Sequence, residues 1–233
     1  MSEGIDYFGR GHWLTSIQER VSLSTRRRMY DLWLEVARPP KGARVLDIGT
    51  TPDRERRDSN CMIPWFHDDG LQVSLYSPED IGTLAGAFPY ATQLPSAGFG
   101  APIPAPDQAF DWAISSAVLE HVGNADAQTA FIAECARVAR GVFLTTPNRW
   151  HWLEFHTKLP LLHWMPREQH RAALRGLGRP VWASESHLRL LDLADVRRMA
   201  EKALGDAFRI ELKTVWALGM PSNIVLVAWR RSG

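Results

Sequence analysis

Short, continuous runs of hydrophobic residues recur along the chain, and polar or turn-forming residues follow each run. Such runs are typical of parallel β-strands that are buried on both faces. They occupy residues 44–48, 71–76, 111–116 and 142–146. A further short strand is expected around residues 90–93, within a stretch from residue 84 to 107 that is otherwise rich in glycine, proline and alanine. These runs predict the strands of an open sheet.

Longer segments between the runs carry apolar residues at the spacing of amphipathic helices. Helices are therefore expected at residues 12–38, 125–139 and 193–204, with a short irregular one at 62–66. Asn124 and Asp192 are the expected N-caps of the second and third of these helices, and Gly141 is the expected stop of the second. Strands and helices that alternate in this way predict an α/β protein with a doubly wound, Rossmann-like sheet.

The second half of the chain departs from this alternation twice. Residues 148–186 are dense in tryptophan, histidine, proline and arginine, which predicts a small inserted helical cap. Residues 208–216 and 223–229 are two consecutive β-like runs after the last helix, which predicts a terminal hairpin. The expected sheet is therefore seven-stranded and mostly parallel, with an antiparallel C-terminal hairpin, in a single domain over residues 1–233.

Composition and charge narrow the classes of function. Of the 233 residues, 45% are hydrophobic and 23% are charged, values that are ordinary for a globular protein in water. The formal net charge of +1 gives no reason to expect a nucleic-acid partner. No segment has the length of a membrane span or the layout of a signal peptide, and Cys61 and Cys135 lack metal or redox spacing. A cytoplasmic protein without a membrane span is expected.

Residues with candidate chemistry follow several strands at one edge of the predicted sheet, where open α/β sheets bind their ligands. They are Asp47 and Gly49 after the first strand, Glu79 and Asp80 after the second, and Ser116, Glu120 and His121 at the end of the run at 111–116. Gly49 lacks a Cβ and lets a ligand approach the backbone closely. Glu79 or Asp80 can accept hydrogen bonds from ribose hydroxyls, as an acid does in dinucleotide folds.

Taken together, these segments resemble the class I S-adenosylmethionine-dependent methyltransferases. Residues 47–53 keep the acid and the first glycine of that family's first motif, residues 103–111 resemble its proline-containing turn into the fourth strand, and residues 118–122 resemble its Leu-Glu-His segment. The resemblance covers about residues 43–148 and implies a bound S-adenosylmethionine, with residues 98–107 near its adenine. The cofactor-binding residues that it implies are Asp47, Gly49, Thr50, Thr51, Glu79, Asp80, Ser116 and Glu120.

The resemblance also implies an activity, the transfer of a methyl group to a small-molecule or glycan-linked acceptor. The Thr-Pro-Asp turn at residues 51–53 is similar to that of some bacterial methyltransferases of glycan pathways. Thr51 and Asp53 stand where later glycines are usual, so they narrow the turn and add negative charge near the cofactor's carboxylate. A noncatalytic methyltransferase-fold protein that serves as a binding partner or scaffold is therefore the alternative. A nicotinamide-dependent oxidoreductase is disfavoured because no Gly-x-Gly-x-x-Gly run follows the first strand.

Histidines supply the candidate catalytic residues. His121, His151 and His156 have the intrinsic pKa range of a base that removes the acceptor's proton. His151, Glu154 and His156 can equally form a structural hydrogen-bond network that holds the cap. The same three residues with His163 have the residue types of a metal site, but their spacing matches no established zinc or iron pattern, so no metal is expected.

Overall fold

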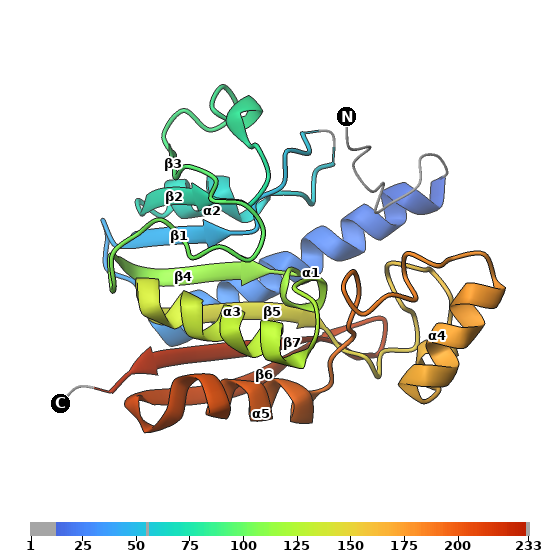
Figure 1. Ribbon diagram of the computed structural model, residues 1–233. Coiled ribbons are helices and arrows are strands. Elements are labelled where there is room, and N and C mark those ends of the chain that lie inside the picture. Colours follow the sequence, from blue (N-terminus) through green and yellow to red (C-terminus); the bar gives the residue numbers. More distant parts are fainter. Residues whose placement is uncertain (1–12, 55, 232–233) are drawn as a thin grey trace.

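The computed structural model of the protein describes residues 13–54 and 56–231. In this part of the chain a seven-stranded sheet forms the centre, and helices cover both of its faces (Figure 1). The strands are β1 (Arg44–Ile48), β2 (Gln72–Tyr76), β3 (Thr92–Gln93), β4 (Phe110–Ser116), β5 (Ala139–Pro147), β6 (Phe208–Ala217) and β7 (Met220–Arg230). Their order in the sheet is β3-β2-β1-β4-β5-β7-β6. The first strand thus lies near the middle.

The direction of the strands confirms the predicted architecture. Strands β1 to β5 pair with their neighbours in parallel, whereas β7 runs antiparallel to both β5 and β6. The second strand of the hairpin lies inside the sheet and the first lies at its edge. The sequence accounts for this order, because β7 contains a continuous buried run from Ile224 to Ala228, whereas β6 keeps most of its residues partly exposed.

Helices form one layer on each face of the sheet. They are α1 (Trp13–Ala37), α2 (Met62–Asp68), α3 (Ala125–Val138) and α5 (Leu193–Leu204). Helices α1 and α2 share one apolar core with one face of the sheet, and α3 and α5 share a second core with the other face (Figure 1). Adjacent residues of β1 point to opposite faces, so Val45 packs in the α1 and α2 layer and Leu46 in the α3 and α5 layer.

The helix ends follow the predicted caps with one exception. The side chains of Asn124 and Asp192 accept hydrogen bonds from the backbone N–H groups of Ala127 and Asp195, which confirms both N-caps. The prediction that Gly141 stops α3 is wrong, because α3 ends at Val138 and Ala139 begins β5 directly. Gly141 lies within β5, where the indole of Trp112 fills the space of a side chain: a Cβ there would be 2.6 Å from a ring carbon.

The segment between β5 and α5 contains the predicted insertion. It includes a 3₁₀ turn, η3 (Leu162–Trp164), and the helix α4 (Arg167–Gly176), which lies beside the sheet and not on either face (Figure 1). Its two ends meet at an isolated parallel bridge between Asn148 and Leu191. Among the helices of the described residues, none combines the length and the hydropathy that crossing a membrane requires.

Candidate functional site

The turn after β1 brings the backbone to the edge of a cavity. Gly49 has a φ of +90°, and its N–H donates to the carbonyl of Tyr76 at the end of β2. A Cβ at this position would lie 2.3 Å from Cγ2 of Val118, which is far inside van der Waals contact. Both the left-handed backbone and the lack of space therefore require glycine here.

The carboxylate of Asp47 contributes a hydrogen bond to this turn. The hydroxyl of the buried Thr50 donates to the Asp47 carboxylate at 2.9 Å. Burial raises the pKa of Asp47 to about 6, against the opposing effects of the Thr50 hydrogen bond and the charge of Arg26. The carboxyl group thus takes up a proton more readily than an ordinary aspartate does.

Side chains hold the rest of the turn, at the positions where the motif that the sequence resembles has glycines. The amide of Asn60 donates to the carbonyl of Thr51 at 2.8 Å and accepts from its N–H at 3.1 Å. The Asp53 carboxylate accepts from the hydroxyl of Ser59 at 2.8 Å and from the N–H of Arg56 at 3.4 Å. Thr51 and Asp53, which stand where the motif has glycines, therefore belong to a loop that side-chain hydrogen bonds hold together. The sequence analysis did not single out Asn60. Its φ is +54°, a left-handed conformation that asparagine adopts more readily than most residues, so an asparagine in this polar run was the available signal.

A cavity of about 1200 Å³, counting its open mouth, lies at the carboxyl ends of β1, β2 and β4. We call it the donor cavity. The predicted residues that line it are Asp47, Gly49, Thr50, Thr51, Glu79, Ser116, His121 and His156. Arg26, Met62, Phe99 and Val118 line it as well and were not predicted individually. Asp80 is not among the described residues of its wall: its carboxylate accepts from the N–H of Gly82, the first residue of the 3₁₀ turn η1 (Gly82–Leu84).

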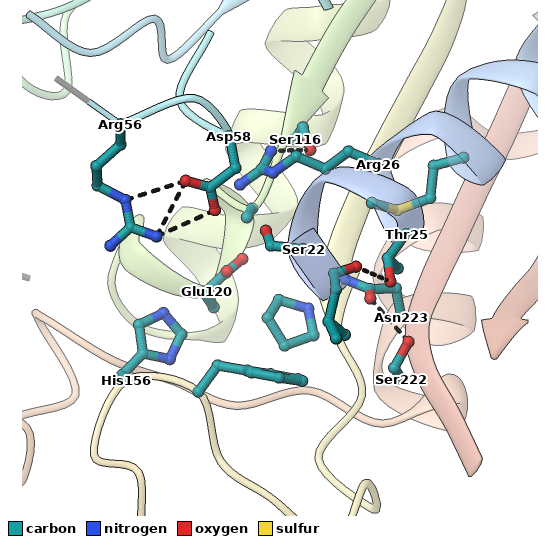
Figure 2. A pocket seen from close by; sticks show the side chains of 15 residues that line it. Ser22, Thr25, Arg26, Arg56, Asp58, Ser116, Glu120, His156, Ser222 and Asn223 are labelled. Carbon is teal, nitrogen blue, oxygen red and sulfur yellow. Dashed lines mark hydrogen bonds and ion pairs between the residues drawn. The ribbon is translucent and has the colours of Figure 1, made fainter. Parts of the chain in front are cut away.

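A second cavity of about 670 Å³, its mouth included, adjoins the donor cavity, since the two share lining residues. Figure 2 shows side chains that line this second cavity. We call it the acceptor cavity. Residues of α1, of the end of β5 and of the start of β7 line it, together with Phe155 and His156. The two cavities share Arg26, Arg56, Asp58, Ser116, Ala117 and His156 as lining residues. Helix α1 therefore does more than cover the sheet, because it forms one wall of this site.

The shared wall carries positive charge that is partly neutralised. Arg26 donates to the hydroxyl of Ser116 at 2.8 Å, and Arg56 donates to both oxygens of Asp58 at 3.1 and 3.0 Å (Figure 2). Burial alone would raise the pKa of Asp58, but hydrogen bonds from Arg56 and Ser22 and the two guanidinium charges lower it. The ionised Asp58 balances one of the two arginines at this wall.

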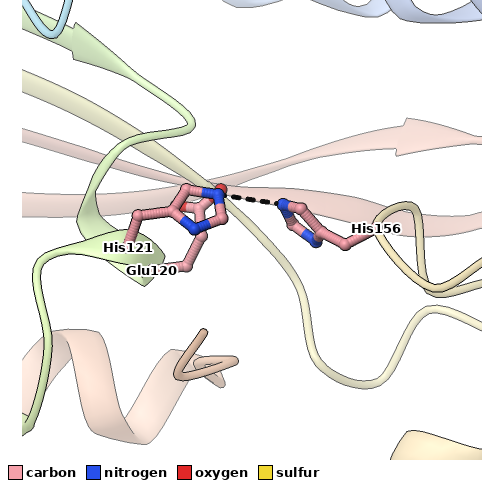
Figure 3. A group of neighbouring side chains, drawn as sticks. All are labelled: Glu120, His121 and His156. Carbon is pink, nitrogen blue, oxygen red and sulfur yellow. Dashed lines mark hydrogen bonds between the residues drawn. The ribbon is translucent and has the colours of Figure 1, made fainter. Parts of the chain in front are cut away.

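Two histidines meet at the junction of the cavities, each oriented by an oxygen on its far side. Nδ1 of His156 is 2.6 Å from the carboxylate of Glu154, and Nδ1 of His121 is 2.7 Å from the carbonyl of His187. The two Nε2 atoms face each other at 3.1 Å (Figure 3). Burial lowers the pKa of both rings, but the charge of Glu154 and its hydrogen bond outweigh burial at His156, whose pKa is raised; the pKa of His121 is lowered.

Carboxylates lie on both sides of the histidine pair. Burial alone would raise the pKa of Glu154, but the charge of His156 and hydrogen bonds from His156 and Thr157 lower it to about 2. Glu120, from the 3₁₀ turn η2 (Leu119–His121), is completely buried and accepts from the hydroxyl of Thr146 at 3.0 Å. Glu120 lines the acceptor cavity and not the donor cavity, contrary to its predicted place among the cofactor-binding residues.

The structure separates His151 from the other two predicted catalytic histidines. The described residues that form the two cavities do not include His151, whose ring nitrogens lie 3.0 and 3.2 Å from the carbonyls of Leu153 and Ala217. Its ring stacks on Phe155 at 5.2 Å, behind the cavity wall. The geometry therefore favours the structural alternative for His151, because its ring nitrogens bond within the inserted segment and to the end of β6. His163 joins it there, with Nε2 at 2.7 Å from the His151 carbonyl.

Comparison with solved structures identifies the fold. A methyltransferase dependent on S-adenosylmethionine from Aquifex aeolicus superposes with a TM-score of 0.57 at 14% identity, over 91% of this chain and 93% of that one. The magnesium protoporphyrin IX methyltransferase of Synechocystis, with bound SAH, gives 0.58 at 17% identity, over 96% and 90%. A Rhodobacter sphaeroides protein provisionally assigned as a Zn-dependent alcohol dehydrogenase gives 0.61 at 15% identity, over 88% and 90%.

The fold is that of the class I S-adenosylmethionine-dependent methyltransferases, as the sequence predicted. No protein-family model matches the chain, and no curated protein matches it significantly. The likeness is one of architecture, and the roles of the site residues rest on the geometry of this chain.

Proposed function

We propose that the protein transfers a methyl group from S-adenosylmethionine to a small polar acceptor. The observation that carries this proposal is the pair of adjoining cavities at the carboxyl ends of the parallel strands, with Ser116, Ala117 and His156 in the wall that both share. Methyl transfer needs two binding spaces that meet at one point, because acceptor atom, methyl carbon and sulfur must lie in line. The donor cavity takes the cofactor and the acceptor cavity takes the substrate.

The donor cavity fits the parts of S-adenosylmethionine. The backbone turn at Gly49 lines this cavity, and Glu79 at the end of β2 offers a carboxylate to the ribose hydroxyls. Phe99, which is 79% exposed at the rim, and the apolar side chain of Met62 offer surfaces for adenine. Arg26 offers a positive charge for the carboxylate of the ligand's methionine part. The cofactor supplies an electrophilic methyl group, whose bond to sulfur breaks and leaves its electron pair on sulfur.

The acceptor cavity supports a substrate that carries hydroxyl groups. Its wall includes Ser22, Thr25, Ser222 and Asn223 (Figure 2), and Phe155 lines it as well. The hydroxyls of Thr25 and Ser222 donate to the carbonyls of Val21 and Val215, so toward a ligand they can only accept. Hydroxyl and amide groups near one aromatic ring suit a hydroxylated ligand, so we propose a hydroxylated small molecule or a glycan-linked precursor as the acceptor. We also propose that residues 148–186 act as the cap of this cavity, since Phe155 and His156 belong to that segment.

The histidine pair lies where the acceptor loses its proton. Glu154 binds Nδ1 of His156, so Nε2 is directed toward the junction, in the manner of a carboxylate that orients a catalytic imidazole. His121 reaches the same point from η2. We therefore propose His121 and His156 as catalytic residues and leave His151 out.

Binding measurements with a matched pair of variants test the proposal. S-adenosylmethionine and its demethylated product are titrated into the protein by calorimetry. NAD is titrated separately, as the ligand of the oxidoreductase alternative. Glu79→Gln is expected to weaken S-adenosylmethionine binding, whereas Asp80→Asn, the same change at the next residue, leaves it unchanged. Transfer of radiolabelled methyl groups to cell extract then reveals the acceptor class.

Two results would contradict the proposal. Failure to bind S-adenosylmethionine at millimolar concentration supports the noncatalytic scaffold, because the turn at residues 50–53 would then block the cofactor. Binding of NAD in the same cavity supports an oxidoreductase instead.

A further inference from the structure

Three potential metal ligands meet at the junction of the donor and acceptor cavities. In the described part of the chain Glu120, His121 and His156 each direct one ligand atom to this point, and these atoms lie within 4.8 Å of one another (Figure 3). We propose that they bind a divalent transition-metal ion. The role of this ion rests on the proposed methyltransferase function. The binding of the ion does not depend on that function.

The orientation of the two imidazoles supports a cation between them. Nδ1 of each ring faces an oxygen that can only accept a hydrogen, so in the neutral rings both Nδ1 atoms donate. Both Nε2 atoms then present lone pairs to each other, at 3.1 Å, and the contact requires a positive charge between them. Either a proton on His156, whose pKa is raised, or a metal ion supplies that charge. Two nitrogens that each lie about 2.0–2.1 Å from one metal, at roughly 90–110° to each other, are roughly 2.9–3.4 Å apart.

Glu120 supplies the third ligand. It has no measurable exposure, and one carboxylate oxygen accepts from Thr146. Its other oxygen, Oε1, is buried and has no hydrogen-bond partner among the described residues. A buried carboxylate oxygen without a partner is costly, and one oxygen of this carboxylate lies within 4.8 Å of ligand nitrogens of both histidines, so the group points to a cation as the missing partner.

The residues behind the ligands have the arrangement that metal sites use. The Glu154 carboxylate holds His156, the His187 carbonyl holds His121, and the Thr146 hydroxyl holds Glu120. Such outer partners fix the ring tautomers and raise the basicity of the ligands. Two imidazoles and one carboxylate suit zinc, iron, cobalt or manganese, whereas magnesium and calcium prefer oxygen ligands alone. The sequence analysis did not find these three ligands, because spacing along the chain places His156 with His151, Glu154 and His163.

The position of the site assigns it a role. His156 lines both cavities, Glu120 lines the acceptor cavity and His121 lines the donor cavity. Three protein ligands leave coordination positions open, and a hydroxyl oxygen of the acceptor can take one of them. Coordination lowers the pKa of that hydroxyl, so its proton passes to water before the oxygen attacks the methyl carbon. The two histidines then serve as ligands that hold the acceptor in line.

Direct metal titration tests the inference. Full-length protein without an affinity tag is stripped with a chelator and titrated with Zn²⁺ and with Co²⁺, in the absence of S-adenosylmethionine. We expect stoichiometric binding, a Co²⁺ visible spectrum of a site with nitrogen ligands, a rise in the melting temperature with Zn²⁺, and no comparable effect of Mg²⁺.

Variants locate the ion. Glu120→Gln and His156→Gln are expected to abolish the Co²⁺ spectrum, and Glu154→Gln, which leaves all three ligands in place, lowers metal affinity about 10–100-fold. His67→Ala is the matched control, because His67 is exposed on α2 and stacks on Tyr90. Melting curves of the chelator-treated variants verify that each one folds. Equal Co²⁺ binding by wild type, Glu120→Gln and His156→Gln, or no binding by wild type, overturns the inference.

The titrations also separate the two proposals. S-adenosylmethionine binding is measured on the chelator-treated protein, where it does not depend on the ion. Cofactor binding without metal uptake rejects the metal site and leaves the methyltransferase proposal standing. Metal uptake without cofactor binding rejects the methyltransferase proposal and keeps the metal site.

Discussion

Gly49 and Val118 pack so closely that no side chain fits at position 49: a Cβ there would lie 2.3 Å from Cγ2 of Val118. This contact joins the turn after β1 to the loop after β4, and both loops line the donor cavity. We predict that Gly49→Ala lowers the free energy of unfolding by about 1–3 kcal/mol, because the residue has a φ of +90°, and weakens S-adenosylmethionine binding as Val118 is displaced. Chemical denaturation and calorimetry measure the two effects.

Gly42→Ala is the matched control for this substitution. Gly42 has a φ of +82°, close to that of Gly49, but a Cβ there would have no neighbour within 4 Å. It should lose stability from backbone strain and keep its cofactor affinity. Val118→Ala in the Gly49→Ala background should recover part of the binding, since it removes the clash but not the strain. Equal cofactor affinity of Gly49→Ala and wild type would contradict the prediction.

The buried carboxyl of Asp47 predicts a dependence of stability on pH. Its pKa is raised from 3.8 to about 6, so the folded protein binds this proton more tightly than the unfolded chain does. Its contribution to the free energy of unfolding is therefore fully present below pH 3.8 and is lost as the pH rises to about 6. The difference between wild type and Asp47→Asn should fall over this window, by on the order of 1–3 kcal/mol.

Urea denaturation at several pH values checks this prediction. Thr50→Val offers a second test, because the Thr50 hydroxyl donates to the Asp47 carboxylate and opposes the rise in pKa. Without that hydrogen bond the window should extend to higher pH. A difference between wild type and Asp47→Asn that stays constant with pH would show that Asp47 has an ordinary pKa.

Phe99 provides a test of where the adenine binds. It lies at the rim of the donor cavity with 79% of its surface exposed, so its ring is accessible to a ligand in that cavity. We predict that Phe99→Ala weakens S-adenosylmethionine binding about tenfold, the effect of losing one base–aromatic stacking contact. Phe99→Tyr keeps the ring and should bind normally. Unchanged affinity in Phe99→Ala would place the adenine elsewhere.

His151 and His156 should respond differently to the same substitution. His151→Ala removes contacts to the carbonyls of Leu153 and Ala217, so we expect a loss of about 1–3 kcal/mol in the free energy of unfolding with S-adenosylmethionine affinity unchanged. His156→Ala should instead abolish most of the turnover, because His156 lies at the junction of the cavities. Denaturation curves and methyl-transfer rates distinguish the two roles. A folded His151→Ala variant with normal stability and no turnover would return His151 to the mechanism.

Local patterns were sufficient for much of the fold. Asn124 and Asp192 cap their helices as predicted, since capping is an interaction within one helical turn. The prediction for Gly141 was wrong because it also relied on local pattern, in which a glycine after a helical segment usually ends the helix. The need for glycine there comes from Trp112 on the neighbouring strand, whose ring fills the space of a side chain. The residues that line the donor cavity were largely predictable because the ends of parallel strands lie at one edge of a sheet.

The sequence by itself determined the α/β class, the hairpin and the edge of the sheet where the two cavities lie, because hydrophobic periodicity and strand ends are local properties of the chain. Only the tertiary structure decided which histidines share a site. His121 and His156 are separated by 35 residues and meet because the loop after β4 and the segment after β5 converge. His151, only five positions before His156 in the sequence, faces away from the cavities, since the backbone between them turns and its ring bonds to the end of β6. Spacing along an irregular segment carries no information about direction in space.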